Sequence, residues 1–464
     1  MEQHETTLDQ DGRYLPHLLA ATQATALDYL AAVDARPAAT DFAAPELLAL
    51  PDASTGAEAA LALFTQRFGD AMPASNGPRF WGFVTGGTTP AALMGDWLAS
   101  AYDLNLSSAA NSVAPAIEFE AIRLLRQLFG LPETFDGTFV TGATMANFAG
   151  LAMGREWVGR QHGLSVAERG LAALPPMAVL GGEAHSSIFK ALAMLGLGRA
   201  SFHRATTLPG DREAVDVAGL ARGLAAQEGR PCIVVANAGT VNTVDFDDLR
   251  AIAALKDDYP FWLHVDAAFG GFAACTPHFR HLVAGMELAD SLTIDAHKWL
   301  NVPYDAAMIF TRHRDTQRAV FQNSAAYLGE VREPVDFVHL APENSRRLRA
   351  LPAWFTLMAY GRSGYRAIVE RNCAQARRFG AMIEAAAEFT LLAPVRLNVV
   401  CFTLAGRPDA AAVAAFLARL RDDGRVFLTP TTLHGTPAIR AAFSNWRTTD
   451  ADLEIAFAAL LACC

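Results

Sequence analysis

Residues 291–298 read Ser-Leu-Thr-Ile-Asp-Ala-His-Lys, and a tryptophan follows at position 299. The first four residues are mostly apolar or β-branched, which predicts a short buried strand. This strand would carry Lys298 to its carboxyl end, beside an imidazole and an indole. A lysine placed by a buried strand suggests chemistry rather than surface charge, and a purely structural lysine is the alternative.

Lysine is rare in this chain, which contains only Lys190, Lys256 and Lys298. Lys190 fits the polar face of an amphipathic helix, and Lys256 fits the solvated end of a helix. Arginine keeps its proton too tightly to act as a nucleophile, whereas a lysine amine can lose its proton on partial burial and form a Schiff base with an aldehyde. We therefore expect a carbonyl cofactor bound covalently to Lys298.

Short apolar runs precede this stretch and alternate with helical patterns. They lie at residues 137–140, 177–180, 232–236 and 262–265. Short strands that alternate with helices predict an α/β domain with a mainly parallel sheet. Ligands of such sheets bind at the carboxyl ends of the strands, where Lys298 is expected.

Three regions are predicted along the chain. Residues 1–82 form helices interrupted by prolines, too short for a large core of their own, and we expect them to pack on a second subunit. Residues 83–349 form the large cofactor-binding domain. Residues 350–464 begin with a long helix and continue with candidate strands, which predicts a small C-terminal α+β domain.

The composition excludes several classes of protein. The 464 residues are 52% hydrophobic and 19% charged, with a formal net charge of −10 and a pI of about 5.7. This balance argues against a nucleic-acid or anionic-membrane surface. The polar N-terminus and the absence of a long apolar run predict a cytoplasmic protein without membrane association. Six scattered cysteines without CxxC spacing, and no HExxH motif, predict neither a disulfide framework nor a metal site.

Two further motifs follow predicted strands. Residues 140–147, Val-Thr-Gly-Ala-Thr-Met-Ala-Asn, lead into a helix whose first amide groups, with the Thr144 hydroxyl, would cradle a phosphate. An ordinary capped turn has the same pattern. Residues 182–187, Gly-Glu-Ala-His-Ser-Ser, place His185 where its ring would stack on a flat heteroaromatic group, with capping or packing as the alternative.

Another two motifs complete the set. Residues 264–271, His-Val-Asp-Ala-Ala-Phe-Gly-Gly, bring Asp266 to the end of a strand, and residues 237–243 form a polar loop. A buried aspartate is costly unless it is paired. A protonated pyridinium nitrogen would pair with Asp266 and strengthen the ring as an electron sink. Together with Lys298, these motifs indicate pyridoxal 5′-phosphate (PLP) as the cofactor.

Residues 264–268, 295–299 and 184–187 resemble the motifs of the group II PLP-dependent amino-acid decarboxylases. That family includes the aromatic L-amino-acid, glutamate, histidine and 2,4-diaminobutyrate decarboxylases, and the resemblance extends from about residue 80 to the C-terminus. It implies the PLP-dependent transferase fold of type I and a homodimer with active sites at the subunit interface. It also implies that an L-amino acid loses carbon dioxide through an aldimine and a quinonoid intermediate to give an amine.

Carried over position by position, the resemblance implies a role for each matching residue. Lys298 would hold the cofactor, Asp266 would pair with the ring nitrogen, and the ring would lie between His185 and Ala268. The other implied contacts are Ala143, Thr144 and His297 with the phosphate, Thr240 near the cofactor, and Trp81 and Phe83 in the substrate pocket.

One position departs from this pattern at the phosphate end. Asp295 stands where the aromatic branch often has asparagine. Since a carboxylate would repel the phosphate, we expect Asp295 to point elsewhere or to be held by a hydrogen bond.

A second departure lies in residues 336–347, which have the spacing of the catalytic loop of the aromatic decarboxylases. A tyrosine of that loop is thought to protonate the carbanion, and Phe337 stands in its place here. Loss of a positioned acid typically costs ~10²- to 10⁴-fold in protonation. The alternatives are an oxygen-dependent route to an aldehyde, ammonia and peroxide, as in plant relatives; a different acid, His339 or Tyr327; or a lid anchor without a chemical role.

The substrate and even catalysis itself stay open at this level. Residues 79–83, Arg-Phe-Trp-Gly-Phe, would form an apolar pocket, and Arg440 would favour an acidic substrate if it pairs with a carboxylate. Packing or a surface ion pair explains each equally well. The alternative outside the enzymes is a PLP-binding protein without catalysis.

Overall fold

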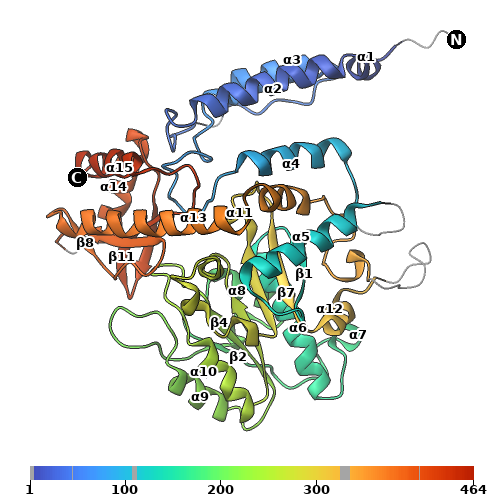
Figure 1. Cartoon of the computed structure of the whole chain (residues 1–464), viewed down its shortest axis with the longest axis vertical. Helices are drawn as coiled ribbons and strands as arrows, with labels where there is room; N and C mark the ends of the chain where they lie inside the picture. The colour runs from blue at the N-terminus through green and yellow to red at the C-terminus, as the bar shows by residue number, and fades with distance from the viewer. Residues whose placement is uncertain (1–4, 44, 107–111, 324–334, 407) are drawn as a thin grey trace.

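The computed structural model describes residues 5–43, 45–106, 112–323, 335–406 and 408–464. A seven-stranded sheet in the order β1-β7-β6-β5-β4-β2-β3 forms the centre of the large part of the molecule (Figure 1). Its strands are β1 (Asp136–Val140), β2 (Val179–Gly181), β3 (Phe202–Arg204), β4 (Cys232–Asn237), β5 (Phe261–Asp266), β6 (Ser291–Asp295) and β7 (Ala307–Thr311).

The sheet is mainly parallel, as predicted. Strands β3, β2, β4, β5 and β6 pair in parallel along this order. Strand β7 runs antiparallel to both β6 and β1. The carboxyl ends of β4, β5 and β6 therefore lie together at one edge of the sheet.

Both faces of this sheet are buried. In β4, Val234 belongs to the core on one face, and its neighbours Ile233 and Val235 belong to the core on the other. Burial on both faces explains why the strands read as continuous apolar runs rather than as alternating patterns. The helices of this part are α4 (Pro90–Tyr102), α5 (Ala114–Phe129), α6 (Ala143–Gln161), α7 (Val166–Arg169), α8 (Ser186–Met194), α9 (Val217–Ala225), α10 (Leu249–Ala254), α11 (Ala296–Trp299) and α12 (Arg314–Phe321).

The C-terminal part is a smaller α+β unit. It begins with the long helix α13 (Ala350–Ala385), which is kinked at Gly361, where φ is 54°. A four-stranded antiparallel sheet follows in the order β10-β11-β9-β8. Its remaining elements are β8 (Phe389–Leu391), β9 (Val399–Leu404), α14 (Ala410–Asp423), β10 (Thr429–Leu433), β11 (Thr436–Ala442) and α15 (Asp450–Ala462).

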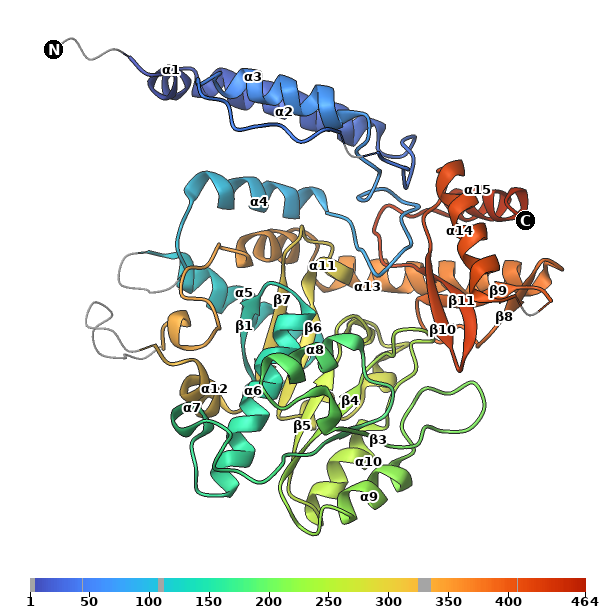
Figure 2. The same ribbon diagram turned by 180° about the vertical axis from the view of Figure 1, so that it is seen from behind.

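The N-terminal helices α1 (Thr7–Arg13), α2 (Leu15–Ala32) and α3 (Ala57–Phe64) project from the rest of the molecule, as Figures 1 and 2 show. None of the residues in these three helices is buried. The division of the chain at residues 82 and 349 stays a prediction. Among the helices of the described residues, none combines the length and the apolar character needed to cross a membrane.

Candidate active site

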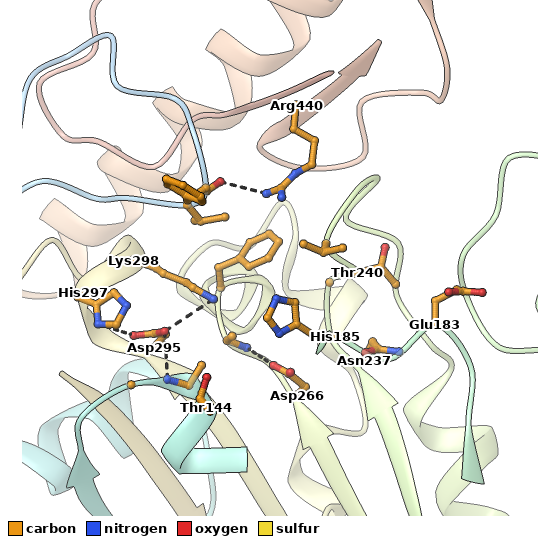
Figure 3. A pocket seen from close by; sticks show the side chains of 18 residues that line it. Thr144, Glu183, His185, Asn237, Thr240, Asp266, Asp295, His297, Lys298 and Arg440 are labelled. Atoms are coloured by element: carbon orange, nitrogen blue, oxygen red, sulfur yellow. Dashed lines mark hydrogen bonds and ion pairs between the residues drawn. The ribbon is translucent and has the colours of Figure 1, made fainter. Parts of the chain in front are cut away.

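A cavity of about 300 Å³ opens at the carboxyl ends of the central strands (Figure 3). The small C-terminal part closes it from the opposite side through Arg440 on β11. The lining residues are Phe83, Val84, Gly142, Ala143, Thr144, Glu183, His185, Asn237, Gly239, Thr240, Val241, Asp266, Ala268, Phe269, Asp295, His297, Lys298 and Arg440. The cavity therefore brings together all eight residues predicted to contact the cofactor: Ala143, Thr144, His185, Thr240, Asp266, Ala268, His297 and Lys298.

Lys298 reaches this cavity because β6 ends at Asp295 and continues directly into the one-turn helix α11. Its Nζ lies 3.7 Å from Asp295 Oδ2 and 5.6 Å from the centre of the Phe269 ring. The amine therefore stands between a carboxyl group and an aromatic face, with access to the cavity.

Asp295 does not point away from the site. Its side chain is only 1% exposed, and its Oδ2 accepts a hydrogen bond of 3.3 Å from the Ala143 amide. Burial raises the pKa of Asp295 to about 7, against the opposing effect of Lys298. The hydrogen bond that was expected to hold Asp295 is therefore present, and its donor, the Ala143 amide, belongs to the predicted phosphate site.

His297 is a neutral ring at physiological pH, because burial lowers its pKa to about 3. Its Nδ1 accepts a hydrogen bond of 3.4 Å from the Ala306 amide, which leaves the ring proton on Nε2. The ring packs on Tyr304 with a centre-to-centre distance of 4.2 Å. His297 can thus offer one N–H donor, without charge, at this end of the cavity.

Asp266 is oriented by two hydrogen bonds. Asn147 Nδ2 donates to its Oδ2 at 2.9 Å, and the Ala268 amide donates to its Oδ1 at 3.1 Å. No cation lies within ion-pair distance of this buried carboxyl group among the described residues. A positively charged group of a ligand in the cavity would supply the partner that the Asp266 carboxyl group lacks.

Asn147 connects this aspartate to the second ring wall. Its amide also donates to Ser187 Oγ at 3.0 Å, and Ser187 Oγ lies 2.8 Å from His185 Nδ1. The position of His185 inside the cavity lowers the pKa of its ring. Sequence reasoning missed Asn147, although its place four residues after Ala143 on the same helix carried the signal.

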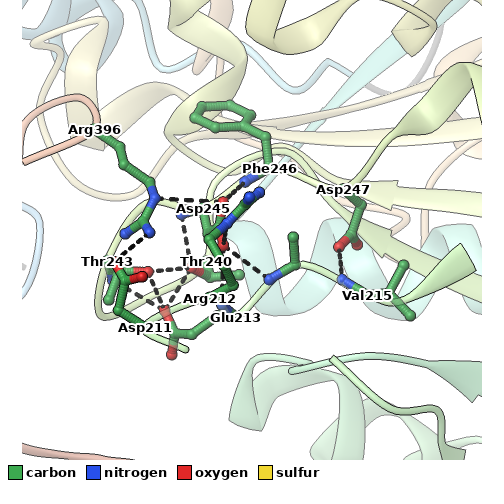
Figure 4. Close-up of polar contacts among 11 residues, drawn as sticks. Asp211, Arg212, Glu213, Val215, Thr240, Thr243, Asp245, Phe246, Asp247 and Arg396 are labelled. Atoms are coloured by element: carbon green, nitrogen blue, oxygen red, sulfur yellow. Dashed lines mark hydrogen bonds and ion pairs between the residues drawn. The ribbon is translucent and has the colours of Figure 1, made fainter. Parts of the chain in front are cut away.

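Thr240 lines the cavity, but its hydroxyl proton is already used. It donates to Glu213 Oε2 at 2.6 Å, and the Thr243 hydroxyl donates to the same oxygen (Figure 4). The Asn242 amide donates to the other oxygen of this buried carboxylate. Asn242 also donates to the Thr432 carbonyl of β10. Glu213 therefore fixes the cavity loop and, through Asn242, connects it to the C-terminal part.

Ion pairs reinforce this connection between the two parts of the molecule. Arg396, from the segment before β9, binds Asp211 at 2.7 Å and approaches Asp245 at 3.6 Å. Asp245 also pairs with Arg212 at 2.7 Å (Figure 4). Sequence reasoning missed this network, because its charges come from segments far apart in the chain.

Arg440 is the main cavity residue that the predictions left undecided. The residue is 7% exposed, and its guanidinium donates a hydrogen bond to the Phe83 carbonyl at 3.0 Å. Burial lowers its pKa to about 10, so the group remains a cation at neutral pH. Among the described residues, no carboxylate lies within ion-pair distance of it.

The two residues expected in the substrate pocket separate. Phe83 lines the cavity and is 61% exposed. Trp81 lies instead in the core of the C-terminal part, where its ring packs on Phe379 and Phe443. Residues two apart on an extended segment would point to the same side, but the backbone of Phe83 has a φ of 57°, which interrupts the extended segment and separates the two side chains.

The two loop residues also lie away from the cavity. Phe337 is 0% exposed, with its ring 4.5 Å from that of Phe119 and under the Arg346 guanidinium at 5.3 Å. His339 is buried, and its Nδ1 accepts from the Asn323 amide at 3.2 Å. Neither is among the described residues that line the cavity. Tyr327 lies outside the described residues.

Comparisons with known proteins agree with this geometry. The family model described as "Pyridoxal-dependent decarboxylase conserved domain" matches residues 68–405. An aromatic-L-amino-acid decarboxylase of Bacillus atrophaeus is 28% identical over 333 residues, which cover 70% of this chain and 67% of that protein. A histidine decarboxylase of Drosophila melanogaster is 31% identical over 384 residues, which cover 78% of this chain and 44% of that protein. This chain thus spans less than half of the Drosophila enzyme.

Solved structures show the same fold. Oryza sativa TDC with PLP and tryptamine has a TM-score of 0.89 and 23% identity, with 97% of both chains covered. Mouse CSAD has a TM-score of 0.89 and 23% identity, with 98% of this chain and 99% of that chain covered.

Proposed function

Because this chain belongs to the family of PLP-dependent amino-acid decarboxylases, we propose that it removes the α-carboxylate of an L-amino acid as carbon dioxide and releases the amine. One observation carries the proposal. Lys298 and Asp266 stand at the ends of neighbouring strands and face one cavity, with the N-terminus of α6 beside them.

The cavity fits PLP, the cofactor of this family. The Thr144 amide and hydroxyl have no hydrogen-bond partner among the described residues, and they stand at the start of a 19-residue helix suited to a phosphate. Ala143 and His297 would complete the phosphate contacts. Asp266 would pair with the ring nitrogen, and His185 and Ala268 would contact the ring. When bound, PLP supplies an aldehyde for covalent attachment and a ring that accepts electrons.

Lys298 is the proposed catalytic amine. It would hold the cofactor between turnovers and yield its place to the amino group of the substrate. Its amine, released into the cavity, would be the group available to return a proton to the α-carbon after carbon dioxide leaves. His185, whose ring is open to the same cavity, is the second group in place for a proton at that carbon.

Arg440 is the proposed site for a substrate carboxylate. It is a buried cation with no acidic side chain within ion-pair distance in the described part of the chain, which is costly unless an anion binds. Figure 3 shows it on the side of the cavity away from Thr144 and Asp266, with Lys298 and His185 between. A substrate carboxylate held there would lie apart from the phosphate.

The amine is favoured over the aldehyde as the product. The aldehyde route was tied to Phe337 standing where an acid would act, and the ring of Phe337 is packed against Phe119 and Arg346 instead. The complete set of cofactor groups counts against a protein that binds PLP without catalysis.

The proposal includes a homodimer. The N-terminal segment exposes large apolar side chains, among them Leu8, Leu19, Leu47 and Leu50, the last two at 93%. Exposed apolar side chains on a projecting segment, here on α1, on α2 and between α2 and α3, are typical of an interface. The molar mass in solution tests this point, and replacing Leu19 by glutamate should weaken the dimer.

The decisive experiment incubates the purified chain with PLP and pools of L-amino acids, and follows amine, aldehyde, carbon dioxide and peroxide together. Amine equal to carbon dioxide, without peroxide, is expected. Lys298→Ala should abolish turnover and the absorption of the lysine-bound cofactor, whereas Lys190→Ala, at an exposed lysine, should leave both unchanged. Aldehyde with peroxide would replace the proposed reaction, and no product from any pool would refute it.

A further inference from the structure

At the phosphate end of the cavity, the carboxyl group of Asp295 uses a hydrogen-bond donor that a bound phosphate would also use. Asp295 Oδ2 accepts from the Ala143 amide at 3.3 Å, and this amide belongs to the helix start that would cradle the phosphate. Figure 3 shows Asp295 between Lys298, His297 and the start of α6. A bound phosphate would therefore meet a carboxyl group that is 1% exposed and cannot turn to solvent.

The charges around Asp295 come from four elements. Lys298 and His297 of α11 lie 3.7 and 3.1 Å away, and the low pKa of His297 leaves its ring without charge at neutral pH. Asp266 of β5 repels a negative charge on Asp295. Tyr304, in the segment after α11, senses the same charge, and α6 contributes the Ala143 amide. Among these described groups, two carboxyl groups, Asp295 and Asp266, thus share a single amine before any phosphate binds.

The contact with His297 identifies where a proton would sit. Asp295 Oδ1 lies 3.1 Å from His297 Nδ1, and no other polar group bonds to this oxygen among the described residues. Nδ1 already accepts the Ala306 amide. Two acceptors facing each other at this distance repel unless one carries a proton. A proton on Oδ1 would turn the contact into a hydrogen bond donated by Asp295.

We propose that the Asp295 carboxyl group takes up one proton when a phosphate group binds at Ala143, Thr144 and His297, so that cofactor loading weakens as the pH rises. The phosphate brings a second negative charge to the donors that Asp295 uses, and the site can hold both only if one is neutral. The inference rests on the proposed function for the position of the cofactor in the cavity, and does not depend on catalysis.

The direction of the pH dependence follows from proton linkage. Burial already places the pKa of Asp295 at about 7 without phosphate, and a bound anion raises it further. Below this value, Asp295 is protonated in both states and affinity does not depend on its titration. Above it, binding must take up a proton, so affinity falls by about tenfold for each pH unit until the pKa of the complex is reached.

The test measures binding of pyridoxamine 5′-phosphate, which has no aldehyde and cannot attach to Lys298, to the cofactor-free full chain between pH 6 and pH 9. The wild type is compared with Asp295→Asn, which keeps the shape of the side chain and removes its titration. The ratio of the two affinities at pH 6, where Asp295 is mostly protonated, serves as the baseline. By pH 8 the wild type should have lost about tenfold more affinity than the variant.

Asp247→Asn is the matched control. Burial raises the pKa of Asp247 to about 6, but its oxygens accept from Val215 and Asn237 and the residue does not line the cavity. This variant should keep the wild-type pH profile. Equal profiles for the wild type and Asp295→Asn would overturn the proposal, as would loss of the pH dependence in Asp247→Asn.

A second measurement needs no variant. Sulfate keeps its double negative charge over this pH range, so its direct binding to the cofactor-free wild type should weaken above pH 7. Calorimetry in buffers of different ionisation enthalpy should show close to one proton taken up per sulfate bound at pH 8. Absence of uptake overturns the proposal. Proton-coupled binding in a chain that forms no amine would uphold it while refuting the proposed function.

Discussion

Replacing Phe337 by tyrosine separates the chemical role suggested by the loop spacing from the structural role that its position indicates. The ring is 0% exposed, 4.5 Å from Phe119 and under the guanidinium of Arg346. A hydroxyl group added there enters a packed core. Burying it without a partner costs about 1–3 kcal/mol, and displacing the ring to make room costs a similar amount.

The expected result is a loss of stability with unchanged chemistry. Urea unfolding of the PLP-loaded protein should show a decrease of about 1–3 kcal/mol or more for Phe337→Tyr. The ratio of amine to aldehyde should not change, because the hydroxyl does not reach the cavity. Phe337→Leu, which keeps the site apolar, controls for loss of the ring and should also leave the product ratio unchanged.

A positioned acid is typically worth ~10²- to 10⁴-fold in proton transfer. If Phe337→Tyr changed the product ratio by more than tenfold and kept the wild-type stability, the side chain would have to act on the reacting carbon. The assignment of Phe337 to the core would then be wrong.

Two other substitutions test buried charges. Glu118→Gln should cost about 3–5 kcal/mol in urea unfolding, because it removes the carboxylate 3.0 Å from Arg346 in a fully buried pair; a double variant with Arg346→Met should recover part of this loss, and no recovery would argue against the pair as the cause. Arg440→Gln should lower kcat/KM by about 10- to 100-fold, as expected for one charge-assisted hydrogen bond, while the absorption of bound PLP stays the same; an unchanged kcat/KM would exclude Arg440 from substrate binding.

Most of the site was predictable because the sheet converts sequence order into spatial order. Lys298 and Asp266 each end an apolar run, and parallel strands bring such ends to one edge. His185 and Thr144 follow strands in the same way. These residues could be placed without knowing any long-range contact.

The residues that were misplaced or missed depend on contacts that strand order does not determine. Trp81 is two residues from Phe83, and only the packing of the C-terminal core decides which of the two faces the cavity. Phe337 matched a loop by its distance from an arginine pair, but Arg346 of that pair is buried against Glu118 and holds the segment in the core. Arg440 approaches the cavity from another sheet, across a boundary that the sequence pattern cannot reveal.

The buried charges of this chain fall into two groups that differ in how they are satisfied. Outside the cavity, Glu213 and Asp247 are saturated by donors of the chain itself. Inside it, Asp266 and Arg440 lack ion partners among the described residues, and Asp295 has an oxygen without a hydrogen bond. Glu213 and Asp247 show that this fold can supply hydrogen-bond donors to buried carboxyl groups. The uncompensated groups therefore mark where a ligand of complementary charge must complete the structure, and binding of that ligand should stabilise the fold by an amount that grows with the logarithm of its concentration.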